Sequence, residues 1–284
     1  MKIGIVGNGF VGSSVAFGFS PQTGCDGAEL RIHDKDEYKS LNTLKEVVNE
    51  SDFIFVSVPT PSNKDGSINL DIVNNIFEEM NKLNHRTDNI FLLRSTVVPG
   101  TTRKIQNNCR RLNVVFNPEF LTERSAKFDF INQARVVLGG DESHTSKVAE
   151  LFSWRFGESL PIVKTNYETA ELVKYVNNCF FSVKISFLNE MRVMSEKCGA
   201  KWEDVVEAFV RDGRVGYSHM NVPGPDGKYG FGGSCFPKDV QAMIDFSEDL
   251  DVNLNVLKGA WETNLEVRPE KDWEKLIGRA ITDE

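Results

Sequence analysis

Cys235 lies in a glycine-rich segment that carries several groups able to do chemistry. The segment reads Gly-Phe-Gly-Gly-Ser-Cys-Phe-Pro-Lys-Asp from Gly230 to Asp239. Pro237 is typical of a helix start, and a thiol beside a helix N-terminus and the ammonium of Lys238 has its thiolate form favoured. We interpret Cys235 as a candidate nucleophile. Three other cysteines are interpreted as small buried core thiols, namely Cys109, Cys179 and Cys198.

Two further pairs of polar residues have spacings that fit a reaction site. Lys174 and Asn178 are four residues apart on a predicted helix, hence on one face. They could stabilise a developing oxyanion, and a solvated helix edge is the alternative. Glu119 and Glu123 follow a strand predicted to be buried, at the carboxyl end where ligands bind in open α/β sheets. Such carboxylates can act as bases or position a water, although acids in the first turn of a helix look identical.

A glycine motif opens the chain. Gly-Asn-Gly-Phe-Val-Gly follows the apolar run Lys2–Val6. Its glycines permit a tight turn, close approach of a pyrophosphate and packing of the next helix, whose first amides would face the phosphates. The predicted contacts are Gly7, Gly9, Phe10, Val11 and Gly12. Asp34 follows the next strand, about twenty residues on, where a carboxylate accepts hydrogen bonds from the ribose hydroxyls and repels a 2′-phosphate. This favours NAD over NADP, with a helix cap as the alternative for Asp34.

Short apolar runs alternate with helical patterns up to residue 165. Near-continuous apolar character indicates strands buried on both faces of a parallel sheet. The predicted strands are Lys2–Val6, Glu29–His33, Phe53–Val58, Ile90–Leu93, Val114–Phe116 and Arg135–Leu138, with helices such as Leu70–Leu83 and Thr145–Phe156 between them. We therefore predict an α/β fold with an N-terminal Rossmann-like, doubly wound parallel sheet. Residues 1–165 would form an NAD-binding domain.

The pattern changes to a helical one after residue 165. Apolar residues recur every three or four positions from Leu172 to Met194, which predicts one long amphipathic helix. Further helices are predicted over Trp202–Val210, from Pro237 to Leu250, and from Leu254 to the end, with an irregular stretch from Arg211 to Gly233. Residues 166–284 would form a smaller all-helical domain. Its long apolar stripe predicts a homodimer.

Composition excludes several classes of protein. The chain has 284 residues, 33 basic and 41 acidic, and a net charge of −8, so a nucleic-acid-binding face is not expected. No run of about 20 apolar residues predicts a membrane span. The five cysteines form no C-x-x-C pair and the four histidines stand apart, so we expect no metal site and a reducing, cytoplasmic location.

Several ordered motifs together resemble the UDP-glucose/GDP-mannose dehydrogenase family over nearly the whole chain. Besides the opening glycines, they are Val58-Pro59-Thr60-Pro61, Ser95–Gly100, Asn117–Glu123, Ala170–Asn178, Ser186–Glu190 and Gly230–Asp239. The resemblance implies NAD-dependent oxidation of a nucleotide sugar, UDP-glucose above all, at C6 to the uronic acid. Two hydrides would leave in succession, and the products would serve polysaccharide synthesis.

The resemblance also implies roles for individual residues. Cys235 would attack the intermediate aldehyde to give a thiohemiacetal, which the second oxidation converts to a thioester that water hydrolyses. Lys174 and Asn178 would stabilise the alkoxide or oxyanion, and Asp239 with Thr96 would hold a water or transfer a proton. The predicted catalytic residues are Cys235, Lys174, Asn178, Asp239, Thr96, Glu119 and Glu123.

Contacts with cofactor and substrate are implied in the same way. The predicted cofactor contacts are Gly7, Gly9, Phe10, Val11, Gly12, Asp34, Lys35, Thr60, Thr96, Glu123 and Lys238. The predicted substrate contacts are Glu119, Phe120, Leu121, Lys174, Asn178, Arg214, Phe231 and Gly232. Arg214 matches an arginine that reaches the sugar nucleotide across a dimer interface, and a solvated loop cation is the alternative.

The chain departs from the family's pattern in length. Family members carry a third domain, which grips the nucleotide, and no such unit is predicted after Leu254. A separate nucleotide-binding domain could be a partner. A truncated, non-catalytic NAD-binding subunit that pairs with a full-length relative is the alternative function. A 6-phosphogluconate or hydroxyacid dehydrogenase shares the predicted layout, but such enzymes transfer one hydride and need no cysteine.

Overall fold

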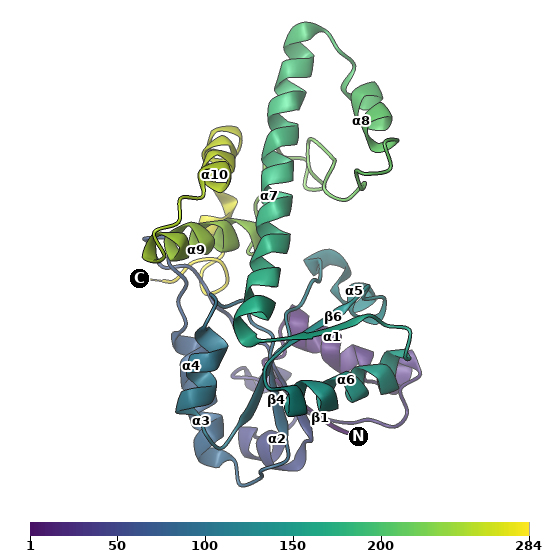
Figure 1. Cartoon of the computed structure of the whole chain (residues 1–284), viewed down its shortest axis with the longest axis vertical. Helices are drawn as coiled ribbons and strands as arrows, with labels where there is room; N and C mark the ends of the chain where they lie inside the picture. Colours follow the sequence, from purple (N-terminus) through teal and green to yellow (C-terminus); the bar gives the residue numbers. More distant parts are fainter. Residues whose placement is uncertain (284) are drawn as a thin grey trace. The chain divides into compact units, whose positions relative to one another are not determined.

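The computed structural model describes residues 1–283, which form two compact units. Unit 1 comprises Met1–Thr60 and Leu70–Lys174, and unit 2 comprises Pro61–Asn69 and the described residues from Tyr175 onward. The chain passes from unit 1 to unit 2 between Lys174 and Tyr175, later than the predicted domain boundary at residue 165. This point lies within one continuous helix, α7 (Tyr167–Cys198), which Figure 1 shows in green.

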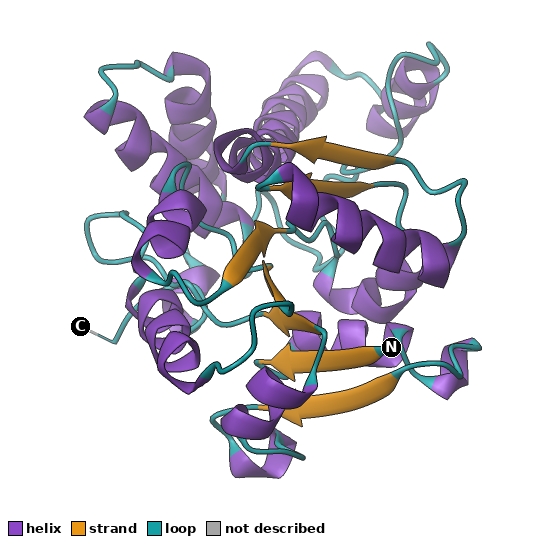
Figure 2. Ribbon diagram, turned by 60° about the horizontal axis from the view of Figure 1, so that its bottom comes forward, coloured by secondary structure: helices purple, strands orange, loops and turns teal. Residues whose placement is uncertain are grey.

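Unit 1 contains a seven-stranded sheet in the order β2-β1-β3-β4-β5-β6-β7, drawn in orange in Figure 2. Strands β1 to β5 are parallel to one another. The chain order reverses between β1 and β3, which makes the carboxyl ends of these strands the expected ligand edge. The predicted doubly wound α/β fold is confirmed. The strands are β1 (Lys2–Val6), β2 (Glu29–His33), β3 (Phe53–Val56), β4 (Ile90–Leu93), β5 (Asn113–Phe116), β6 (Val136–Gly139) and β7 (Ile162–Thr165).

The last two strands differ from a purely parallel sheet. Strand β6 pairs antiparallel with β5 through Phe116 and Gly139, and β7, which the sequence analysis did not predict, runs parallel to β6. The connection from β5 to β6 contains one six-residue helix, α5 (Ala126–Ile131). Because six residues span only about 9 Å, this helix does not carry the chain back across the sheet. The chain therefore enters β6 from the edge at which it left β5.

Helices cover the sheet of unit 1. Successive side chains of each strand point to opposite faces of the sheet and therefore enter two different cores. In β3, Ile54 and Val56 belong to one core, whereas Phe55 belongs to the other. In α2, a capping box between Thr43 and Glu46 fixes the helix start. Besides α5, the helices of this unit are α1 (Phe10–Gly18), α2 (Leu44–Glu50), α3 (Asp71–Leu83), α4 (Thr101–Asn108) and α6 (Glu142–Phe156).

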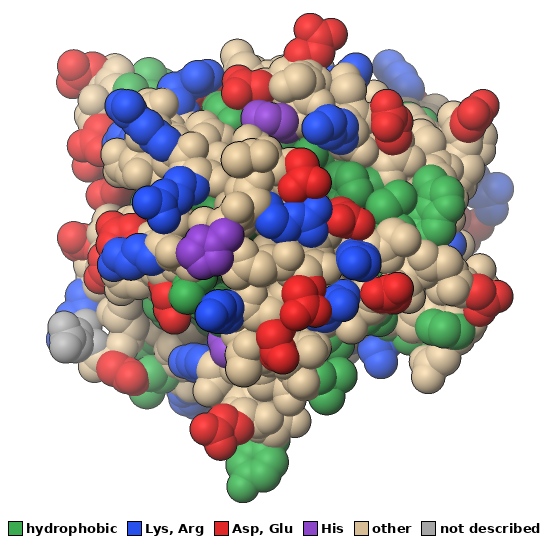
Figure 3. Space-filling view, turned by 90° about the horizontal axis from the view of Figure 1, so that it is seen from below, with side chains coloured by type: hydrophobic (Ala, Val, Ile, Leu, Met, Phe, Trp, Pro, Cys, Tyr) green, Lys and Arg blue, Asp and Glu red, His purple; other side chains and the backbone are tan. Residues whose placement is uncertain are grey.

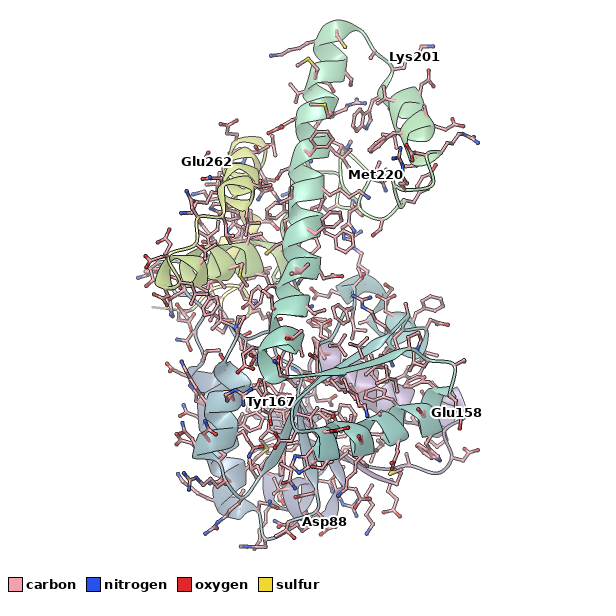
Figure 4. The ribbon with its side chains drawn as sticks, in the orientation of Figure 1. Asp88, Glu158, Tyr167, Lys201, Met220 and Glu262 are labelled. Atoms are coloured by element: carbon pink, nitrogen blue, oxygen red, sulfur yellow. The ribbon has the colours of Figure 1, made fainter. Side chains whose placement is uncertain are left out.

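Unit 2 is helical. Most of α7 belongs to it, together with α8 (Trp202–Val210), α9 (Phe236–Asp249) and α10 (Asn255–Val267). Met220, labelled in Figure 4, is buried in a small core with Leu188 of α7 and Trp202 of α8.

Two expectations for unit 2 are corrected. The last helix does not run to the end of the chain, since α10 ends at Val267 and a 3₁₀ turn follows over Asp272–Lys275. Cys198 is exposed at the end of α7 rather than buried in a core, because the helix terminus leaves it at the surface.

Charged side chains of both signs lie on the surface. Figure 3 shows Lys and Arg side chains interspersed with Asp and Glu on the face it presents, without a stripe of a single sign. Within residues 1–283, no helix is both long enough and apolar enough to cross a membrane.

Candidate functional site

The opening glycines of unit 1 form the turn between β1 and α1. Gly7 has a φ of +87°, and a Cβ at Gly12 would lie 1.9 Å from the carbonyl oxygen of Gly7. Both positions therefore require glycine. A Cβ at Gly9, in contrast, would meet no described atom within 4 Å. Gly9 is the N-cap of α1, and no side chain of the described residues caps this helix. The turn thus presents an open helix N-terminus to an incoming anion.

Asp34 follows β2 beside this turn. One carboxylate oxygen accepts a hydrogen bond of 2.6 Å from the N–H of Asn8, and the other accepts from the N–H of Asp36 at 2.9 Å. The carboxylate is therefore oriented by main-chain groups on both sides. The neighbouring Lys35 side chain is exposed.

The segment after β4 is held against the segment after β3. Thr60 Oγ1 donates to the carbonyl oxygen of Thr96 at 2.9 Å. Ser95 Oγ accepts from the N–H of Val58 at 3.0 Å and donates to its carbonyl oxygen at 2.7 Å. Thr96 is half-buried, whereas Thr60 is buried. The structure thus brings together two of the predicted cofactor contacts.

Glu119 and Lys174 form a buried ion pair within unit 1. The Lys174 ammonium lies 2.8 Å from Glu119 Oε1 and donates to the Glu119 carbonyl oxygen at 2.7 Å. The second carboxylate oxygen accepts from the N–H of Leu121 at 2.7 Å. The two side chains are only 5% and 7% exposed, so each charge depends on the other. Lys174 Nζ also lies 5.7 Å from the centre of the Phe120 ring.

Behind this pair, Arg94 is buried at the end of β4. Its guanidinium donates to the side-chain oxygen of Asn117 and lies over the rings of Phe55 and Phe130. Burial lowers the pKa of Arg94 to about 10, although the nearby charge of Glu119 opposes this shift. Arg94 therefore remains a cation at neutral pH and adds a second positive charge near Glu119.

Glu171 holds the turn that precedes α4. Its carboxylate accepts hydrogen bonds from the N–H of Gly100 at 2.6 Å, from the N–H of Thr102 at 2.7 Å and from Thr102 Oγ1 at 2.6 Å. Burial raises the pKa of Glu171 to about 7, since the lowering effect of these hydrogen bonds is smaller. Glu171 of α7 thus caps α4 and fixes the end of the Ser95–Gly100 segment.

In unit 2, Cys235 occupies the N-cap of α9. Pro237 lies in the first turn of this helix, as the sequence predicts. The cysteine side chain is half-buried, and its sulfur lies 3.7 Å from Ser234 Oγ. The thiol therefore stands where the amides at the start of the helix favour a negative charge.

Asp239 is bound between two predicted site residues one turn further along α9. Its Oδ1 lies 2.5 Å from the ammonium of Lys238, and its Oδ2 accepts from the side-chain amide of Asn178 at 2.5 Å. All three side chains are buried. The N–H of Asp239 donates to the carbonyl oxygen of Cys235 at 2.9 Å. The structure thus brings Asn178, Lys238, Asp239 and Cys235 together within unit 2.

Other predicted residues lie outside these clusters. The side chains of Glu123 and Arg214 are exposed. Arg214 forms two hydrogen bonds with Asp212 of its own loop, at 2.5 and 2.7 Å. The Phe231 ring is buried, with ring centres 6.3 Å from Phe236 and 6.1 Å from Trp261. The Phe231 side chain therefore packs within the protein, whereas its main chain forms part of the loop before Cys235.

Sequence reasoning missed several buried polar residues that support these groups. Their partners lie far away in the chain, so no helical period identifies them, although Asn117, Glu171 and Asn189 fall inside motifs of the resemblance. A polar residue on an otherwise buried helix face could have indicated Glu171, Asn189 and Asn264, whereas Arg94 and Asn117 each directly follow a buried strand. The buried residues are Arg94, Asn117, Glu171, Asn189, Asn264 and Arg268, and the half-buried Asp272 joins them. Within residues 1–283, no group of three or more His, Cys, Asp or Glu side chains could hold a metal ion.

The doubly wound sheet, the glycine turn before α1 and the carboxylate after β2 define a dinucleotide-binding α/β protein. Residues 28–154 match the NAD binding domain of the UDP-glucose/GDP-mannose dehydrogenase family, and residues 168–266 match its central domain. The chain belongs to the UDP-glucose/GDP-mannose dehydrogenase family. NAD is the cofactor of the matched N-terminal domain, which confirms the predicted cofactor.

Individual relatives agree with this assignment. The chain is 33% identical to a UDP-glucose 6-dehydrogenase of Rickettsia conorii over 251 residues, which cover 86% of this chain and 55% of that protein. It is 30% identical to the Rickettsia felis protein of the same name over 311 residues, covering 97% of this chain and 67% of that one. The chain spans about half the length of most of the curated relatives it matches.

A solved structure has the same fold. A UDP-glucose dehydrogenase from the archaeon Pyrobaculum islandicum superposes with a TM-score of 0.82 at 28% identity, covering 97% of this chain and 70% of that one.

Proposed function

We propose that the protein oxidises a nucleotide sugar, UDP-glucose in the first place, at C6 to the uronic acid with NAD. The observation that carries this proposal is Cys235 at the N-cap of α9, one turn before a buried Asp239 that both Lys238 and Asn178 hold. Simple alcohol oxidation needs no thiol at a helix N-terminus, whereas oxidation of an aldehyde through a covalent intermediate does. Membership of the family supports the same substrate class.

The residues of unit 1 fit NAD. The open space over Gly9 and the uncapped start of α1 match a pyrophosphate, and Asp34 matches the adenosine ribose. A 2′-phosphate would meet the negative charge of Asp34, which disfavours NADP. When bound, NAD accepts the hydride. The further contacts that we propose are Phe10, Val11, Lys35, Thr60, Thr96, Glu123 and Lys238.

The proposed reaction balances as two oxidations and one hydrolysis. In the first, the C6 alcohol loses a hydride to NAD and a proton to a base, giving the aldehyde. The Cys235 sulfur then bonds to C6 while a proton goes to the C6 oxygen, giving a thiohemiacetal. A second hydride leaves to a second NAD and the C6 hydroxyl gives its proton to a base, so that the C6 centre becomes a thioester. Water cleaves the C–S bond, which releases the carboxylate and restores the thiol. The covalent bond retains the reactive aldehyde between the two oxidations.

Side-chain hydrogen-bond donors would stabilise the oxygen on C6 as its charge develops. We assign this role to the Lys174 ammonium and the Asn178 amide. The short contact of Asp239 with Asn178 orients the amide, and Asp239 with Thr96 would hold a water or transfer a proton. We assign Glu123 to positioning of the hydrolytic water and Glu119 to the sugar.

Substrate contacts beyond the reacting atoms follow from the resemblance alone. We propose that the main chain at Phe120, Leu121, Phe231 and Gly232 lies along the sugar nucleotide. Arg214 is exposed and, among residues 1–283, pairs with the carboxylate of Asp212 in its own loop, so we propose that its guanidinium reaches a nucleotide bound to a second copy of the chain.

Stoichiometry tests the proposed function directly. The chain is mixed with NAD and UDP-glucose, and NADH absorbance is followed together with uronic acid. The proposal predicts two NADH for each acid formed, and a single NADH for each sugar would contradict it. Cys235→Ser should lower the rate of acid formation by more than about a thousandfold, since the nucleophile is lost. The matched control is Cys198→Ser, which replaces an exposed thiol at the end of α7 and should leave the rate unchanged.

We also propose that the protein acts as a homodimer through α7. Side chains on this helix are exposed in the single chain although they are apolar, among them Val176 at 60%, Phe187 at 50% and Met194 at 58%. Such a face is typical of an interface. Light scattering should give twice the 32.0 kDa of one chain. Phe187→Glu should shift the protein to a monomer, whereas the charge change Lys197→Glu near the end of the same helix should not.

A further inference from the structure

Two of the glycines before Cys235, Gly230 and Gly232, pack against side chains of the protein itself. A Cβ at Gly230 would lie 2.4 Å from Asn264 Oδ1 and 3.0 Å from a methyl group of Val267. A Cβ at Gly232 would lie 2.4 Å from Asp272 Oδ1 and 2.5 Å from a terminal nitrogen of Arg268. The contacts with Asn264, Asp272 and Arg268 are so short that these side chains would have to move to admit a Cβ, so the loop backbone packs directly on residues of α10 and of the turn after it.

Asn264 binds both main-chain groups of one loop residue. The N–H of Phe231 donates to Asn264 Oδ1 at 2.7 Å, and Asn264 Nδ2 donates to the Phe231 carbonyl oxygen at 3.0 Å. The Asn264 side chain is fully buried. A second amide, Asn189 of α7, accepts from the N–H of Gly230 at 3.0 Å. Because these buried groups have no water to replace a lost partner, the loop has one favoured position.

Arg268, at the C-cap of α10, fixes the flanks of the loop. It is 3% exposed and donates to Asp226 and to Asp272, both at 2.6 Å, and to the Tyr229 carbonyl oxygen at 3.2 Å. Asp272 in turn accepts from the N–H of Gly233 at 3.2 Å. Burial opposes the charge of Arg268, but the two carboxylates outweigh it and raise the pKa of the guanidinium.

We propose that Asn264 and Arg268 are positioning residues, which set the place of the Cys235 thiol at the start of α9 by fixing residues 229–233. The proposal rests on the proposed function in taking Cys235 as the nucleophile. Hydrogen bonds hold the loop as far as Gly233, and α9 begins at Phe236. Cys235 therefore lies in the short connection between these two fixed segments. Movement of the anchored part would carry the sulfur away from the helix amides that favour its thiolate.

The test measures the pH dependence of Cys235 alkylation by iodoacetamide in the full chain, with the modified peptide quantified by mass spectrometry. Asn264→Asp removes the donor to Phe231, and Arg268→Lys keeps the charge but cannot bind both aspartates in the same geometry. We expect the alkylation midpoint to rise in both variants and the rate at neutral pH to fall about fivefold or more. Where the chain turns over substrate, kcat should fall while the KM for NAD stays unchanged.

Matched controls come from the same helix. Thr263→Ala removes a hydrogen bond from α10 to Glu190 of α7, and Lys258→Ala removes an exposed ion pair with Glu248. Neither residue contacts the loop through the bonds it loses, so both variants should keep the wild-type midpoint. The midpoint responds to the surroundings of the sulfur rather than to overall stability, which separates positioning from a merely structural role.

An unchanged alkylation midpoint in Arg268→Lys would overturn the proposal. If Asn264→Asp fails to fold, the conservative Arg268→Lys variant alone tests it. Alkylation of Cys235 is measured without catalytic turnover. If the wild-type chain alkylates at Cys235 but forms no uronic acid, the proposed function fails while the loop comparison remains valid.

Discussion

The two glycine-rich segments of the molecule use glycine for different reasons. In the turn before α1, the space over Gly9 is open, because a Cβ there would meet no described atom within 4 Å. In the loop before α9, the space over Gly230 and Gly232 is filled by Asn264, Arg268 and Asp272. The first segment leaves room for a ligand, and the second packs its backbone against the protein. A glycine motif alone therefore does not say whether a ligand or a side chain requires it.

The largest effect is expected where a glycine of the first segment meets backbone. A Cβ at Gly12 would lie 1.9 Å from the carbonyl oxygen of Gly7, and neither atom can move without shifting β1 or α1. Gly12→Ala should lower the free energy of unfolding by more than about 3 kcal/mol. Urea unfolding measures the change. If Gly12→Ala lowers the free energy of unfolding by less than about 1 kcal/mol, the turn does not require glycine at this position.

A third glycine turn, at Gly100, extends the comparison because a titratable side chain holds it. The folded-state pKa of Glu171 is about 7 against an ordinary 4.5, so folding favours its protonated form. Stability from this group is therefore present below pH 4.5 and is lost as the pH rises towards about 7, by about 3 kcal/mol in total.

The Glu171 expectation is checked by unfolding between pH 4.5 and 8. Glu171→Gln should flatten the fall in stability over this window. Glu168→Gln is the matched control, since Glu168 is a half-buried partner of Arg103 near the start of the same helix. The assignment of the slope to Glu171 fails if the Gln variant keeps the slope of the wild type.

An intermediate effect is expected at Gly232. Gly232→Ala places a methyl group against the Arg268 guanidinium and Asp272, and should cost about 2 kcal/mol of unfolding free energy. Truncation of the arginine should relieve the clash, so the added cost of Gly232→Ala should shrink in an Arg268→Ala background. Strict additivity of the two changes would show that the arginine is not what requires this glycine.

The smallest effect on stability is expected at Gly9, together with the sharpest effect on binding. Gly9 has an extended backbone that alanine adopts readily, so Gly9→Ala should change the unfolding free energy by no more than about 0.5 kcal/mol. The methyl group would occupy the space proposed for the pyrophosphate, and the Kd for NAD should rise at least about tenfold. Calorimetry measures this Kd, and unchanged NAD affinity would refute the proposed use of the open space.

Local patterns predicted the parts of the site that depend on neighbouring residues. The glycine turn follows a strand and opens a helix, and Pro237 marks the start of α9 just after Cys235. Helical spacing likewise predicted that Lys174 and Asn178 share one face of α7, and it left a solvated helix edge as the alternative. The structure buries both side chains. Their partners Glu119 and Asp239 lie 55 and 61 positions away, so local spacing did not predict these pairings.

Long-range partners could not be predicted in the same way. Asn264 binds a residue 33 positions away, and Glu171 binds one 69 positions away, and no sequence period links such pairs. The antiparallel pairing of β6 depends on how far α5 carries the chain, which apolar runs do not encode. Just after the end of α10 at Val267, Arg268 donates to the carbonyl oxygen of Tyr229, 39 positions away, and no local pattern encodes this contact.

The central claim is that a thioester forms on one sulfur atom. The most direct measurement quenches the chain in acid during turnover of isotopically labelled UDP-glucose with NAD and maps the modified peptides by mass spectrometry. The account predicts label on the peptide that contains Cys235 and none in Cys235→Ser. Formation of labelled uronic acid at the wild-type rate without any labelled Cys235 peptide would contradict it.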